Sequence, residues 1–186
     1  ADVVFHLASP VDPSRDSCLV PMMERGIVET TQNIATACLS AGARLVVTGT
    51  CEEYGSSQAP FSEETEVAPV SPYSSAKVKM TRAILAECKE TGLKATVVRP
   101  FLTYGPGQRS SRLVPSAIRA ALGGRPFEMT GGLQTREFNY ISDIGDGIIA
   151  RSLAVPTRLC TLRRRHQGAQ PCRANHVTSI DLECTG

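Results

Sequence analysis

Short apolar runs that alternate with longer segments of helical periodicity most constrain the fold of this chain. Strand-like runs occur at residues 3–7, 44–49 and 93–100, and apolar side chains recur at three- and four-residue steps in 20–41 and 72–90. A nearly continuous apolar run indicates a strand buried on both faces. Strand, helix, strand, helix, strand in this order predicts an α/β fold, a parallel sheet with helices on its faces.

Residues that start and stop helices support this division of the chain. Gly42 follows the first helical segment as a plausible stop, and Ser71, followed by Pro72, is a candidate N-cap for the second. We expect two further helices at 112–122 and 144–153, the latter capped by Asp143.

Length and composition indicate one globular domain inside the cell. The 186 residues are 41% apolar, but no apolar run approaches the roughly 20 residues of a membrane helix, and no secretory signal opens the sequence. The seven cysteines are odd in number and irregularly spaced, which favours reduced thiols. We therefore expect a cytoplasmic protein without a membrane partner. The net charge of +2, with no basic stripe among aromatic residues before 150, gives no indication of nucleic acid.

The last part of the chain differs from the rest. Six arginines stand against two acidic residues in 151–186, and neither helical nor alternating apolar spacing continues after Val155. We predict a folded domain over 1–155 and a divergent, poorly structured tail over 156–186. The tail carries cysteines and histidines without the short spacing of zinc modules, so no metal site is predicted; these are Cys160, His166, Cys172, His176 and Cys184.

Tyr73 and Lys77, four residues apart, are the first candidates for chemistry. On a helix they share one face, where an ammonium near a phenol favours the phenolate. Such a tyrosine can act as an acid or base near neutral pH. Taken alone, the pair is better explained as part of a solvated helix surface, because this spacing occurs often by chance. Thr50 strengthens the first interpretation, because it follows a predicted buried strand, at the end where parallel sheets bind ligands.

Five motifs in order make the chain resemble a known family. They are "HLAS" (6–9), "TGTCEEYG" (48–55), "SPYSSAK" (71–77), "VVRPFLTYGPGQ" (97–108) and "TREFNYISDI" (135–144). Together they resemble the extended short-chain dehydrogenase/reductases, the NAD-dependent nucleotide-sugar epimerases and dehydratases. The resemblance implies a Rossmann-like sheet, NAD or NADP as cofactor with NAD favoured, a nucleotide-sugar substrate and a homodimer.

The resemblance also implies roles for individual residues. Tyr73 would be the acid/base, Lys77 would lower its pKa and hold the nicotinamide ribose, and Thr50 would orient the reacting oxygen. Further cofactor contacts would come from Leu7, Ala8 and Pro100. Substrate contacts would come from Arg136, suited to a diphosphate, and from Leu102, where many members have asparagine. Asn33 and His6 match positions that are usually structural.

Two residues of the loop after the second strand have competing interpretations. Glu52 stands where family dehydratases carry an acid that helps to eliminate water, but the same motif resembles members that epimerise or reduce a 4-keto sugar, and a loop glutamate without a chemical role is equally compatible. Cys51 could be a nucleophile if a histidine lay within reach. His6 is the one histidine before residue 166, so a bystander cysteine is the better interpretation.

The glycine-rich turn that binds the dinucleotide pyrophosphate in this family has no counterpart in the chain. We therefore expect a sheet that is incomplete at its N-terminus, a fragment of a longer protein, and little or no activity from the isolated chain. The alternatives are a nucleotide-4-keto-sugar reductase, or a non-catalytic nucleotide-binding protein on the same scaffold.

Overall fold

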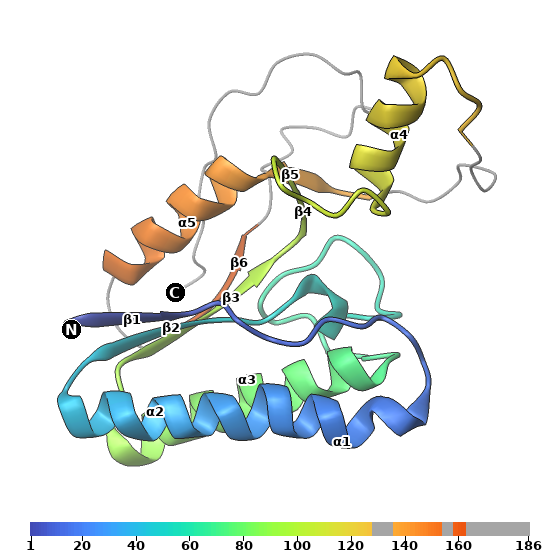
Figure 1. Ribbon diagram of the computed structural model, residues 1–186. Helices are drawn as coiled ribbons and strands as arrows, with labels where there is room; N and C mark the ends of the chain where they lie inside the picture. Colours follow the sequence, from blue (N-terminus) through green and yellow to red (C-terminus); the bar gives the residue numbers. More distant parts are fainter. Residues whose placement is uncertain (128–135, 154–157, 163–186) are drawn as a thin grey trace.

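The computed structural model describes residues 1–127, 136–153 and 158–162. Its main sheet consists of four parallel strands in the order β1-β2-β3-β6, as Figure 1 shows. These strands are β1 (Val3–His6), β2 (Arg44–Thr48), β3 (Ala95–Pro100) and β6 (Arg158–Leu162). A second parallel pair is formed by β4 (Leu102–Tyr104) and β5 (Phe138–Tyr140). The predicted parallel α/β architecture is confirmed.

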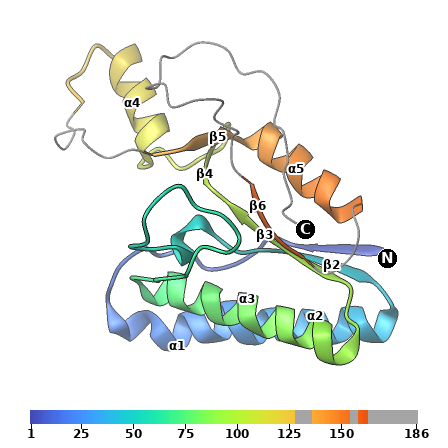
Figure 2. The same cartoon turned by 180° about the vertical axis from the view of Figure 1, so that it is seen from behind.

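Helices cover both faces of the main sheet (Figures 1 and 2). One face carries α3 (Pro72–Thr91) and a continuous helical segment made of α1 (Val20–Met23), a π-helical stretch (Glu24–Glu29) and α2 (Thr30–Ala41). The other face is covered by α5 (Ile141–Leu153). The remaining helix, α4 (Leu113–Leu122), lies away from the main sheet, near β4 and β5.

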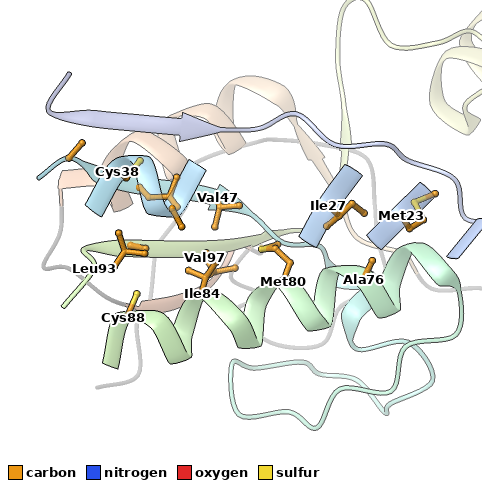
Figure 3. Close-up of a cluster of buried hydrophobic side chains, with 14 of the residues drawn as sticks. Met23, Ile27, Cys38, Val47, Ala76, Met80, Ile84, Cys88, Leu93 and Val97 are labelled. Atoms are coloured by element: carbon orange, nitrogen blue, oxygen red, sulfur yellow. The ribbon is translucent and has the colours of Figure 1, made fainter. Parts of the chain in front are cut away.

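The core divides into two layers because successive side chains of a strand point to opposite faces. Leu45, Val47 and Val97 point toward α1, α2 and α3, where they meet the buried residues shown in Figure 3. Val46 and Val98 point the other way and pack against α5. The apolar runs of β2 and β3 are therefore continuous because both of their faces are covered, as the sequence predicts.

The predicted helix signals hold at two places and fail at one. Gly42 ends α2 in the left-handed conformation, with φ of 65°, and Ser71 caps α3. Asp143, in contrast, is not the cap of α5, because this helix already begins at Ile141, directly after β5. Asp143 lies instead in the first turn of α5, where the positive end of the helix dipole stabilises its carboxylate.

The first strand is less buried than its apolar run predicts. β1 lies at one end of the strand order, and Phe5 is 43% exposed. Val3 packs against the cluster beneath α5, but Phe5, two residues further on the same face, extends beyond that cover. The expectation that β1 is buried on both faces is therefore wrong for the described residues.

A strand also forms where the sequence predicts a poorly structured tail. Residues 158–162 make β6, which pairs with β3 so that Cys160 lies opposite Val98 and Leu162 opposite Pro100. Cys160 and Leu162 are buried. The strand has only five residues and takes its hydrogen bonds from β3, so its own sequence carries little signal. The rest of the predicted tail, 156–157 and 163–186, lies outside the described residues, and this part includes His166, Cys172, His176 and Cys184.

Among the described residues, Cys18, Cys38 and Cys51 are free cysteines. A search of the described residues found no helix with the length and apolar character needed to span a membrane.

Candidate active site

The first turn of α3 is built by a capping box that presents Tyr73 and Lys77 to the sheet. The Ser71 hydroxyl accepts from the Ser74 amide at 3.1 Å, and the Ser74 hydroxyl accepts from the Ser71 amide at 3.0 Å. Tyr73 and Lys77 are 7% and 3% exposed. Tyr73 and Lys77 are therefore not a solvated pair on the helix surface but two buried polar groups at the end of a parallel sheet.

Lys77 connects α3 to the end of β2. Its ammonium donates to the carbonyl oxygen of Thr48 at 2.6 Å and lies 5.9 Å from the centre of the Tyr73 ring. Burial lowers the pKa of Lys77 to about 8, although the nearby carboxylate of Glu53 acts in the opposite direction. Within the described part of the chain, this bond to Thr48 uses one of the three donors of the ammonium.

The side chain of Thr50 lies close enough to Tyr73 to lower the pKa of its phenol. The direction of its pKa shift differs from the expectation. Burial raises the pKa of Tyr73 to about 12, the nearby side chain of Thr50 lowers it by less, and the acidic residues nearby raise it further. The net shift is upward in this chain by itself, because desolvation of the phenolate is the largest effect.

Thr50 stands at the junction of β2 and a short 3₁₀ turn, Cys51–Glu53. It has an extended backbone, and its hydroxyl accepts from the amide of Glu52 at 3.2 Å. Its own amide donates to the carboxylate of Glu53 at 2.9 Å. These two bonds fix the backbone on both sides of the Thr50 side chain, which is 8% exposed.

Glu52 is half-buried at the same edge and lies in the field of two arginines. Burial raises the pKa of Glu52, and the charges of Arg112 and Arg136 lower it. The fold thus brings Arg136, which begins the segment before β5, close to the loop after β2. Arg112, the residue just before α4, also lies near Glu52 and was not singled out by the sequence.

The alternative of a cysteine nucleophile is not supported by the geometry. Burial raises the pKa of Cys51 to about 12, with Glu52 and Glu137 adding to the effect. The thiol is therefore protonated at neutral pH, and the reactive form of cysteine is the thiolate. The ring nitrogen Nε2 of His6 instead forms a hydrogen bond with the hydroxyl Oγ1 of Thr31 at 3.1 Å, which agrees with a structural role.

The remaining predicted residues lie near the carboxyl ends of the strands, except Asn33. Leu7 and Ala8 follow β1 and are exposed, Pro100 ends β3 and is half-buried, and Leu102 is exposed at the start of β4. Carboxyl ends of parallel strands share one edge, where dinucleotides bind in such sheets. The exposed backbone after β1 and the remaining donors of Lys77 fit a ribose and nicotinamide at this edge. Asn33 is exposed on α2.

Sequence reasoning missed a buried ion pair directly beneath Thr50. Arg99 donates to one carboxylate oxygen of Glu53 through Nε at 2.9 Å and through Nη2 at 2.6 Å. Their side chains are 4% and 0% exposed. One signal was available in the sequence. Arg99 is a charged residue within the buried strand β3, and Glu53 lies shortly after the end of β2, so each needs a partner if it is buried.

The chain has clear relatives. Residues 1–154 match the model of the NAD dependent epimerase/dehydratase family. A UDP-N-acetyl-alpha-D-glucosaminuronate decarboxylase of Bacillus cytotoxicus is 34% identical over 167 residues, covering 80% of this chain and 49% of the relative. A dTDP-glucose 4,6-dehydratase of Streptomyces griseus is 32% identical over 152 residues, covering 80% and 46%. This chain therefore spans about half the length of the curated relatives it matches.

A solved structure supports the same relationship. MoeE5 in complex with UDP-glucose and NAD resembles this chain with a TM-score of 0.79 and 31% sequence identity. The match covers 88% of this chain and 56% of MoeE5. The Rossmann-like α/β fold expected from the five motifs is confirmed by this similarity.

Proposed function

The chain belongs to the NAD dependent epimerase/dehydratase family, and we propose that it contains the proton-transfer centre of an enzyme that acts on a nucleotide sugar with NAD as the hydride carrier. The observation that carries this proposal is the burial of Tyr73, Thr50 and Lys77 together, with the Lys77 ammonium 5.9 Å from the centre of the Tyr73 ring and Thr50 close enough to lower the pKa of the phenol. A non-catalytic protein on this scaffold would have no need to keep three such polar groups buried together.

In this proposal Tyr73 exchanges a proton with a sugar hydroxyl, and Thr50 hydrogen-bonds the same oxygen. Lys77 holds the ribose next to the nicotinamide, with Leu7, Ala8 and Pro100 lining the cofactor side. NAD, when bound, would accept a hydride from the sugar carbon and return it later. This choice of NAD over NADP is supported by the relatives, among which MoeE5 was solved with NAD.

The protonation state of Tyr73 decides which half of the exchange it can perform unaided. With a pKa of about 12, the phenol is protonated at neutral pH and can donate to an oxyanion. To accept a proton, it requires a positive charge that favours the phenolate. Lys77 is mainly protonated at neutral pH, because its pKa of about 8 lies above 7. A cation bound against the phenol would act in the same direction.

The second set of side chains suits the substrate. Arg136 can bind a diphosphate through its planar guanidinium, and Leu102 would face the sugar. We propose Glu52 as an additional acid or base. This is supported by its environment, because burial raises the pKa of Glu52 and the charges of Arg112 and Arg136 lower it. Its presence favours elimination-type chemistry, of the class named for the dehydratase and decarboxylase relatives, over simple reduction of a 4-keto sugar. A homodimer remains part of this proposal.

Tyr73→Phe is the direct test of this function. We expect the substitution to lower turnover of a nucleotide sugar by about 10²–10⁴-fold, because a phenyl ring cannot transfer a proton. Binding of the nucleotide sugar, measured by calorimetry, is expected to persist. Tyr104→Phe is a matched control, since Tyr104 packs edge-on against Tyr140 in the β4–β5 pair.

The assay is made on the 186-residue chain and on the chain extended at its N-terminus with a glycine-rich strand–turn–helix of the family type. Turnover confined to the extended chain is what the sequence predicts. Unchanged turnover in Tyr73→Phe, with the control equally active, would contradict the assignment of Tyr73.

A further inference from the structure

The Glu53 carboxylate divides its two oxygens between two tasks. Oε2 accepts both hydrogen bonds from Arg99, and Oε1 accepts the amide of Thr50 at 2.9 Å. Glu53 has no exposed surface, so these bonds are not exchanged for bonds to bulk water. The carboxylate therefore connects the last part of β3 to the first residue of the loop that follows β2.

Gly49 shows how closely this carboxylate is fitted to the backbone. A Cβ atom at position 49 would lie 2.4 Å from Oε1 of Glu53 and 3.1 Å from Cγ of Arg99. Any side chain here would displace the carboxylate from the Thr50 amide or move the end of β2. The close approach thus requires glycine directly before Thr50.

Aromatic side chains separate the ion pair from solvent. The guanidinium of Arg99 lies 4.9 Å from the centre of the Tyr54 ring, and Phe61 stacks on the same tyrosine with ring centres 4.8 Å apart. The hydroxyl of Tyr54 is 2.8 Å from that of Thr161, so the loop is also connected to β6. In a site of low dielectric, the charge-assisted bonds of Glu53 hold their geometry more firmly than they would in water.

A buried ion pair of this kind adds little stability over apolar side chains of the same size, because both charges lose their hydration. Stability alone therefore does not explain it. What the pair does achieve is orientation. The amide of Thr50 donates to Glu53, its hydroxyl accepts from the amide of Glu52, and the same side chain lies close enough to Tyr73 to affect its pKa.

We propose that Glu53 and Arg99 are positioning residues, in which the carboxylate of Glu53, fixed by Arg99, holds the Thr50 backbone so that its hydroxyl meets the oxygen of Tyr73. The inference rests on the proposed function, because it assigns Thr50 and Tyr73 to one reacting oxygen. Neither Glu53 nor Arg99 touches the substrate in this arrangement.

The test replaces both charged residues together, since removing one would leave the other buried without a partner. Glu53→Met combined with Arg99→Met is measured in the N-terminally extended chain described above, once with wild-type Thr50 and once in a Thr50→Val background. With Thr50 present, we expect turnover to fall about 10- to 100-fold at nearly unchanged KM, the size of effect that a small displacement of a reacting group produces. In the Thr50→Val background the same pair of substitutions is expected to change turnover by less than about twofold.

Exchange of single amide protons gives a readout that needs no activity. The Thr50 amide, which loses its acceptor, is expected to lose protection in the paired variant. The Gly49 amide donates to the backbone of Val98 at 2.7 Å and is expected to stay protected, which makes it an internal control. Retained protection of Thr50, or an equal loss of turnover in both Thr50 backgrounds, would overturn the inference. Absence of turnover in every protein, including wild type, would instead count against the proposed function, and the amide measurement would still decide the positioning role.

Discussion

Two buried polar clusters lie at the carboxyl end of the sheet, and their charged groups have different kinds of partner. In the first, Glu53 and Arg99 neutralise each other through bonds of 2.6 and 2.9 Å. In the second, Lys77 meets a neutral carbonyl and Tyr73 a neutral hydroxyl. In this second cluster, burial is the main cause that lowers the pKa of Lys77 to about 8 and raises the pKa of Tyr73 to about 12.

The difference teaches what each cluster can contribute. Burial of a matched pair of charges yields a fixed geometry. Burial without a bonded opposite charge leaves a group whose proton affinity is shifted, which is the property of groups that move protons. The first cluster is thus suited to hold the second in place.

Breaking the matched pair is expected to have the largest effect on stability. Arg99→Met removes the counter-charge and leaves the fully buried carboxylate of Glu53 without it. We expect the free energy of unfolding to fall by about 3–5 kcal/mol, measured by denaturant titration. Arg82→Met, at an exposed position of α3, is the control and is expected to change it little. A loss below about 1 kcal/mol would show that Glu53 and Arg99 are not a coupled pair.

The unmatched charge of Lys77 predicts a pH dependence of stability. Its folded pKa of about 8 lies below the ordinary value of 10.5, so between these values the unfolded chain holds a proton that the folded chain has released. The free energy of unfolding should therefore rise with pH over this window. His6, Tyr73 and Glu53 are the titratable groups that interact with Lys77.

Lys77→Met is expected to remove this rise, whereas Lys79→Met, at the exposed ion pair with Glu24, should keep it. The measurement is denaturant unfolding at several pH values between 7 and about 10.5. The same slope in both variants would mean that the ammonium of Lys77 is not desolvated, and the contrast between the two clusters would disappear.

The smallest expected effect concerns the cap that orients the second cluster. Ser71→Ala removes the acceptor of the Ser74 amide, and we expect a loss of about 1 kcal/mol in the free energy of unfolding. Ser75→Ala, within the same helix, is expected to cost less, because it leaves the capping box in place. Equal losses would indicate that the start of α3, and with it the placement of Tyr73, is fixed by packing rather than by the cap.

Much of the frame followed from local signals in the sequence. The strands β2 and β3, the end of α2 at Gly42 and the start of α3 at Ser71 were predicted, because each depends on neighbours within a few residues. That Tyr73 and Thr50 serve one substrate oxygen stays a prediction from the family motifs. The exposed face of β1 and the strand β6 were not predicted, because burial and pairing there depend on segments far along the chain.

By itself, then, the sequence determined the alternation of strands and helices, the family motifs and the residue types available for proton transfer. Only the tertiary structure decided their environment. Glu53 and Arg99 are 46 positions apart. No local sequence pattern predicts that Glu53, in the loop after β2, and Arg99, near the end of β3, are buried against each other. The same holds for the pKa values of Tyr73 and Lys77, because desolvation depends on what packs over a group, and that is set by the whole fold rather than by the three residues between them.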